Sequence, residues 1–310
     1  MTSPLRGAVA RIAILSAGDP SPVPTMLAEF IEALLPECRI EVLDPGRSDA
    51  RDHDAVLFAG GGRRPAPSIH MHSHRVRHPR LTSLRPVPSG RCRVDILWSD
   101  ASFRPAPGAS GALPHPAEEE LLALAFRWAA GSPGSRVIMA EAVGRDSSVR
   151  LPVARFERLA AEHPGVRAER LRADAVLAAV RRASPGRWIL LLPDGVDGEA
   201  GALMTSLLGG HELAVRRELA PGEPPVFTAV VHSHDGRPGP VGTVLAVGSL
   251  LEYLGEAEAA ELVWSGVERA FDAGVVPMTL GGSSTMEEVL WWISHQVPIL
   301  RRLPGRDSGT

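Results

Sequence analysis

The stretch that decides the fold is Leu250–Val289, "LLEYLGEAEAAELVWSGVERAFDAGVVPMTLGGSSTMEEV". Long apolar and charged repeats at helical spacing predict that the chain is mostly helical from residue 241 onward. The glycine pair in "LGGSST", residues 280–285, predicts a tight turn between helices. Tyr253 belongs to the first of these helices, where it is expected to pack against the core.

The chain before this stretch alternates between strand and helix patterns. Strands are predicted for "RIAIL", "RIEVLD", "HDAVLFAGGG", "RVDILW", "RVIMAEAV" and "RWILLLPDG", beginning at residues 11, 39, 53, 93, 136 and 187. Helices are predicted over 25–36, 117–131 and 153–165. Such alternation indicates an α/β protein with a largely parallel sheet. The GxGxxG fingerprint of dinucleotide-binding folds is absent from the sequence.

Composition narrows the class of protein. The 310 residues carry a formal net charge of -3, which argues against nucleic acid as a partner. No apolar run approaches the roughly 20 residues that a membrane-spanning helix needs. The N-terminal residues lack the apolar core of a secretory signal, so we expect a cytoplasmic protein. Cys38 and Cys92 are expected to be thiols rather than a disulfide.

Some residue types are missing altogether. All 33 basic residues are arginine, because the sequence contains no lysine. It also contains no asparagine, and Tyr253 is the single tyrosine. Any mechanism that needs a lysine, an asparagine or a second tyrosine is therefore excluded.

The run Leu250–Val289 resembles the isopropylmalate and isocitrate dehydrogenase family, the β-decarboxylating dehydrogenases. That family has a "LEYLGE" helix, a second helix and then "DLGGTASTEE". The stretches "HDAVLFAGGG", "LRPV", "VDILW", "LLGG" and "PPVF" also have counterparts in the family's order, so the resemblance covers nearly the whole chain.

The resemblance implies two α/β domains with an active-site cleft between them, typically completed by a second subunit. The first domain would comprise residues 1–80 and 210–310, and the second residues 81–209. We expect a homodimer, or a hetero-oligomer with an intact homologue. The loop around 106–116 is shorter than the family's dimer arm, so a dimer would depend on helices of the middle domain.

The basic segment "HSHRVRHPRLTSLRPV" contains two arginines at an informative spacing. In the family, the "LRP" arginine and another ten residues before it bind substrate carboxylates; these positions are Arg85 and Arg75. The family's third arginine corresponds to Ser99, and Arg104 is a candidate substitute. From the residues alone, a solvated basic loop is the alternative.

The resemblance also implies a site for Mg²⁺ or Mn²⁺, of which only part remains. Asp174, in "LRADAV", matches one family aspartate. Glu199 matches a second if the sequence is counted forward from the preceding strand, and Gly198 does if it is counted backward. A divalent cation needs several oxygen ligands, so Asp174 and Glu199, helped by Asp194 or Asp197, would bind it weakly.

The family's proton-transfer lysine and tyrosine have no equivalents. Glu141, in "MAEAV", occupies the position of the lysine. It could act as a general base in different chemistry, or it could form a structural ion pair with Arg145.

The segment that binds NAD(P) in the family is also altered. Thr228 replaces its glutamate and Gly239 its asparagine, while His232 matches its histidine. About six residues are missing, and with them backbone contacts that a dinucleotide needs. Binding of NAD(P), which the resemblance implies, is therefore in doubt.

The sequence also contains two histidine clusters. His70, His72 and His74 would share one face of an extended strand, and His232 and His234 form a second pair. They could bind a transition metal or form ordinary polar segments.

The sequence leaves three candidate functions. The first is an enzyme that keeps a cleft for a small hydroxy or oxo carboxylic acid but has remodelled chemistry. The second is a non-catalytic regulatory or ligand-binding subunit. The third, NAD(P)-dependent oxidative decarboxylation, is disfavoured by the missing lysine, tyrosine and asparagine.

Overall fold

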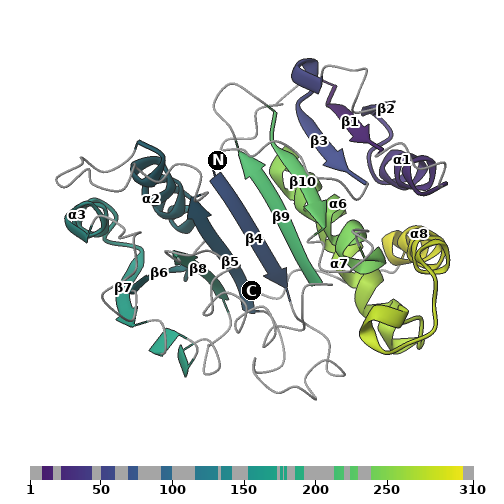
Figure 1. The fold of residues 1–310 in the computed structure, drawn as a ribbon. Coiled ribbons are helices and arrows are strands. Elements are labelled where there is room, and N and C mark those ends of the chain that lie inside the picture. The colour runs from purple at the N-terminus through teal and green to yellow at the C-terminus, as the bar shows by residue number, and fades with distance from the viewer. Residues whose placement is uncertain are drawn as a thin grey trace, which may run out of the picture. The chain divides into compact units, whose positions relative to one another are not determined.

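We analysed a computed structural model of the 310-residue chain. The structure describes residues 9–16, 22–43, 50–59, 69–75, 92–99, 116–131, 134–141, 153–172, 175–176, 178–179, 186–191, 213–219, 224–229 and 239–302. Figure 1 shows the order of their helices and strands along the chain.

The chain divides into two compact units. Arg64–Gly222 form one, which we call the middle unit, while Thr2–Arg63 and Glu223–Thr310 together form the terminal unit. Two strands, β4 (Ile69–Arg75) and β9 (Ala214–Leu219), pair with each other inside the middle unit.

The terminal unit contains four described strands, in the spatial order β2-β1-β3-β10. Each described pairing among them is parallel. Central strands of a parallel sheet are covered on both faces and therefore read as continuous apolar runs, as β1 and β3 do. The edge strand β2 is far more exposed. The bounds are β1 (Arg11–Leu15), β2 (Arg39–Leu43), β3 (Ala55–Phe58) and β10 (Val226–Ala229).

Four α-helices lie in the described residues of the terminal unit. Helix α6 is buried on nearly every side because it packs against β3, β10, α7 and α8. None of the described helices is long and apolar enough to cross a membrane. The bounds are α1 (Val23–Leu34), α6 (Pro240–Leu254), α7 (Ala257–Asp272) and α8 (Met286–Arg302), with short 3-10 turns η1 (Ala50–Asp52) and η5 (Met278–Leu280).

Small residues allow these helices to approach closely. A Cβ placed on Gly248 of α6 would lie 3.3 Å from a methyl group of Val263 in α7. One placed on Gly266 of α7 would lie 2.9 Å from Ile293 in α8. Both positions are tighter than a larger side chain would accept, so the glycines set the spacing of the three helices.

The predicted glycine turn is present, and its two glycines serve different purposes. Gly281 has a φ of 83°, a left-handed conformation that favours glycine. Gly282 passes so close to the chain that an added Cβ would lie 1.9 Å from the Val276 carbonyl oxygen. Its amide donates to the Pro277 carbonyl at 3.0 Å, and the Ser284 amide donates to the Val276 carbonyl at 3.0 Å.

The middle unit is built on a sheet with the order β9-β4-β5-β8-β6-β7. Strands β5, β8, β6 and β7 run parallel, whereas β4 is antiparallel to both of its neighbours. The remaining described bounds are β5 (Cys92–Ser99), β6 (Arg136–Glu141), β7 (Arg167–Arg172), β8 (Gly186–Leu191), α2 (Pro116–Ala130) and α3 (Val153–Glu162).

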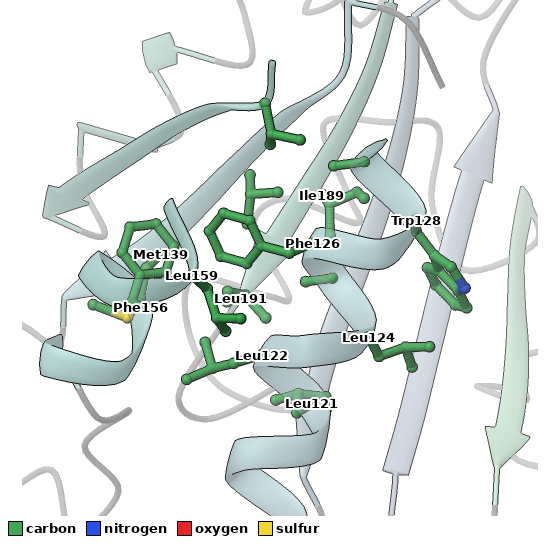
Figure 2. Close-up of a cluster of buried hydrophobic side chains, with 14 residues drawn as sticks. Leu121, Leu122, Leu124, Phe126, Trp128, Met139, Phe156, Leu159, Ile189 and Leu191 are labelled. Atoms are coloured by element: carbon green, nitrogen blue, oxygen red, sulfur yellow. The ribbon is translucent and has the colours of Figure 1, made fainter. Parts of the chain in front are cut away.

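A hydrophobic core joins α2 and α3 to one face of this sheet. Figure 2 shows the ring of Phe126, from α2, among apolar side chains of α3 and the strands. Phe126 is fully buried, and its ring meets that of Phe156 edge-on with centroids 5.4 Å apart. Met139 of β6 and Leu191 of β8 belong to the same cluster. This face therefore positions the carboxyl ends of β6 and β8 relative to α3.

Candidate functional site

The carboxyl ends of parallel strands are where α/β proteins usually place their ligands. In the middle unit, β5, β6 and β8 end on this edge at Ser99, Glu141 and Leu191. Glu141, which stands where the resemblance places a proton-transfer lysine, is the last residue of β6 on this side of the sheet. Its side chain is 40% exposed.

Glu141 is held by an arginine that the sequence analysis did not identify. The Arg170 Nε donates to Glu141 Oε1 at 2.9 Å, and Nη2 donates to the same oxygen at 2.5 Å. The Arg170 Nη1 donates to Glu157 Oε1 at 2.8 Å. One guanidinium thus connects β6, β7 and α3. The ion pair considered from the sequence involved Arg145, which lies outside the described residues.

Charge-assisted hydrogen bonds of this kind are stronger than those between neutral groups. The hydrogen bond to Glu141 is the largest cause that raises the pKa of Arg170 above the usual arginine value, and partial desolvation opposes it. Arg170 itself is 37% exposed, so water and salt screen the interaction. To remove a proton from a substrate, Glu141 would have to act through Oε2 or leave this ion pair.

Arg75, a predicted substrate ligand, lies at the opposite end of the strands in the same sheet. It is the last residue of β4 and is in register with Arg93, near the start of β5, whereas Ser99 ends β5. Through the strand pairings, Glu141 lies level with Ser99, six residues along β5 from Arg93. Arg75 and Glu141 are therefore about 20 Å apart along the strand direction, at 3.3 Å per residue. The structure therefore does not bring the Arg75 backbone together with Glu141.

The alternating residues His70, His72 and His74 lie in β4. They are opposite Glu218, Arg216 and Ala214 of β9, respectively. Among the residues that the structure describes, no group of three His, Cys, Asp or Glu side chains forms a potential metal site.

The described part of the expected cofactor segment does not fit the family pattern. Thr228 offers a neutral hydroxyl where the resemblance predicts a carboxylate, and this hydroxyl donates to the Ala229 carbonyl at 3.2 Å. Gly239, at the asparagine position, precedes α6 in an extended conformation. Tyr253 is a packing residue, as expected, with its ring centroid 5.7 Å from that of Phe227.

Several predicted site residues lie outside the described residues. These are Arg85, Arg104, Asp174, Asp194, Asp197, Glu199, His232 and His234. Their roles stay predictions. Of the two cysteines, Cys38 is a partly buried free thiol.

The described strands and helices form a two-unit α/β protein, and its fold is similar to that of a β-decarboxylating dehydrogenase. A crystal structure of a β-decarboxylating dehydrogenase from Thermococcus kodakarensis, in its apo form, matches 96% of this chain and 100% of its own, with a TM-score of 0.69 and 17% identity. A chain from the Euglena gracilis mitochondrial ATP synthase, in a structure of the peripheral stalk, matches 93% and 100%, with a TM-score of 0.59 and 14% identity. At these identities, the likeness establishes the fold alone.

Comparison by sequence adds nothing to this. No family model matches the chain, and no curated protein is significantly similar to it.

Proposed function

We propose that this protein is a non-catalytic member of the dehydrogenase fold that binds a small hydroxy or oxo carboxylic acid. Arg75 and Arg85 would bind the carboxylates, because their planar guanidinium groups match such anions. The protein would act as a ligand-binding or regulatory subunit, in a homodimer or with an intact homologue.

The observation that carries this proposal is the engagement of Glu141 by Arg170. In the family, the corresponding position carries a lysine that transfers protons. Here a carboxylate takes its place and shares one guanidinium with Glu157. This network is typical of a structural link between strands and a helix.

Two further features support a binding role. The Arg75 backbone lies about 20 Å along the strands from the level of Glu141, so a small acid beside one does not reach the other. The Euglena gracilis chain, from a structure of the ATP synthase peripheral stalk, is consistent with use of this fold within an assembly.

The residues expected to bind a cation and NAD(P) are also incomplete. Asp174 and Glu199 would supply two carboxylates for Mg²⁺ or Mn²⁺, fewer than a tight site for a hard cation needs. Such an ion, when bound, polarises substrate oxygens. In the family that the sequence resembles, a glutamate at the position of Thr228 contacts NAD(P), and the neutral threonine does not replace its carboxylate. The proposal therefore assigns no step to the cation or to NAD(P).

A remodelled enzyme is the second candidate, and the location of Glu141 favours it. The residue ends a parallel strand at the edge where α/β enzymes bind ligands, and it is 40% exposed. Oε2 could then serve as a general base.

Calorimetric titration with a panel of small di- and tricarboxylic acids tests the proposal. We expect one acid to bind, and Arg75→Ala or Arg85→Ala to weaken its affinity by roughly 10- to 150-fold, as is usual for loss of a charged hydrogen bond. Arg158→Ala is the matched control, because Arg158 is exposed on α3 and pairs with Glu162 in its own helix. Equal affinities in all three variants would contradict the arginine assignment.

The same mixtures separate the two candidates. If the protein only binds, NMR spectra of the acid stay unchanged over hours with protein, Mg²⁺ and NAD(P) present. Consumption of the acid that Glu141→Gln abolishes would favour the remodelled enzyme and contradict the non-catalytic role.

A further inference from the structure

The outer face of α8 carries a stripe of three exposed side chains, two of them large and apolar. Trp291, His295 and Ile299 follow one another at four-residue intervals, which places them along one side of the helix. All three are exposed; Trp291 retains 56% and Ile299 49% of their accessible surface. Large side chains gathered in this way are common at protein interaction sites.

The stripe lies opposite the face that α8 already buries. Leu290, Ile293 and Val297 are at most 3% exposed, and the helix packs against α1, α6 and α7. Burial inside the terminal unit therefore accounts for the inner face only. The outer side of α8 carries exposed polar side chains, such as Glu287 and Glu288, together with these large apolar ones.

Trp291 is also held in place. Its ring centroid lies 4.1 Å from that of His295. The Trp291 carbonyl oxygen accepts a hydrogen bond from His295 Nδ1 at 2.7 Å and one from Ser294 Oγ at 2.8 Å. The ring contact with His295 limits the conformations open to the exposed Trp291 side chain, which reduces the entropy lost when a partner covers it.

We propose that a second copy of this chain covers the stripe, with the two α8 helices antiparallel about a twofold axis near His295. Trp291 of each copy then lies against Ile299 of the other, because both are four residues from His295. A twofold interface requires a surface that complements itself, and this pairing meets that requirement.

The charges along α8 select the antiparallel orientation. The first turn carries Glu287 and Glu288, and the helix ends with Arg301 and Arg302. Glu288 and Arg302 stand seven residues on either side of His295, so antiparallel copies bring these two positions together. A parallel pair would bring like charges together. Antiparallel helix dipoles add to the same preference.

This dimer differs from the one expected from the sequence, which used helices of the middle unit. It is independent of the proposed ligand, so either proposal can fail without the other.

Sedimentation velocity over a concentration series tests the interface. We expect a wild-type dimer and, for Trp291→Asp, a dissociation constant at least about 30-fold higher, because a central tryptophan usually dominates such an interface. Val42→Asp is the control: Val42 is 48% exposed on β2 of the same unit and should leave the dimer intact. A monomeric wild-type protein, or a dimer that survives Trp291→Asp, overturns the proposal.

Cross-linking provides a second readout that does not depend on tolerance of Trp291→Asp. A residue on a twofold axis meets its own copy, so His295→Cys should form a disulfide-linked dimer under mild oxidation. Val42→Cys and the wild-type protein, with its native Cys38 and Cys92, should stay unlinked. Failure of His295→Cys to link, or equal linking of Val42→Cys, contradicts the axis.

Discussion

Glu141 and Arg170 lie on neighbouring parallel strands, and both hydrogen bonds between them end on the same carboxylate oxygen, Oε1. Arg170 uses its remaining terminal nitrogen for Glu157 of α3. The residue at the position where the sequence resemblance places a lysine is thereby tied into the scaffold of the middle unit. This arrangement is the basis of the non-catalytic role proposed above.

Removal of the guanidinium tests how much this link stabilises the middle unit. We expect Arg170→Met to lower the melting temperature by at most about 2–4 °C, because exposed ion pairs contribute little. The effect should shrink in 1 M salt, where charges are screened. Differential scanning calorimetry at two salt concentrations measures both. Arg158→Met, which removes a pair within one helix, is the control; an equal or larger loss there would contradict the account.

Gly282→Ala should destabilise the terminal unit by about 3 kcal/mol, because its Cβ would overlap the Val276 carbonyl and force the backbone to move. Urea denaturation monitored by tryptophan fluorescence measures the loss. Gly165→Ala is the control, since nothing lies within 4 Å of that Cβ, and it should change stability by less than about 0.5 kcal/mol. Similar losses for both variants would refute the close approach.

Cys38 should react slowly with alkylating reagents until high pH. Burial, followed by the nearby charge of Glu32, raises the pKa of this thiol above its usual value of 9.0. The folded state therefore holds the proton more tightly than the unfolded state. The stability of the folded protein should therefore fall as pH rises above the pKa that the Cys38 thiol has in the unfolded protein.

Mass spectrometry of the peptide that contains Cys38, after iodoacetamide treatment between pH 7 and 11, gives the titration curve. The midpoint should be higher in the folded protein than in urea, and Glu32→Gln should lower it. Coincident curves for folded and unfolded protein would rule out the shift.

Local patterns predicted much of the fold. The strands beginning at Arg11 and Arg39 and the helical C-terminal part are present because each has a clear apolar period or run. Helix α1 begins two residues before the predicted start, since Pro22 caps it and Pro24 is accommodated in its first turn. The "LGGSST" turn forms because Gly281 and Gly282 meet separate backbone requirements.

The candidate site was harder to predict, because Arg170, the partner of Glu141, comes from a strand whose sequence does not look like one. β7 reads "RAERLR" and lies at the edge of the sheet, where exposure permits charged side chains. Its pairing with β6 depends on tertiary structure and not on its own propensity. Arg170 could therefore not be connected to Glu141 from sequence spacing. β9, "AVRREL", was also missed, since its sequence has no clear strand pattern.

The central claim is tested most directly by NAD(P)H formation at 340 nm with isopropylmalate, isocitrate or tartrate, Mg²⁺ or Mn²⁺, and an intact homologue as the positive control. We predict no turnover above background. General acid–base groups typically contribute roughly 10²–10⁴-fold each, and the chain has no lysine and no second tyrosine to supply them. A turnover number within about tenfold of the homologue's would contradict the account, since it would mean that Glu141 or another group sustains the family's proton transfer.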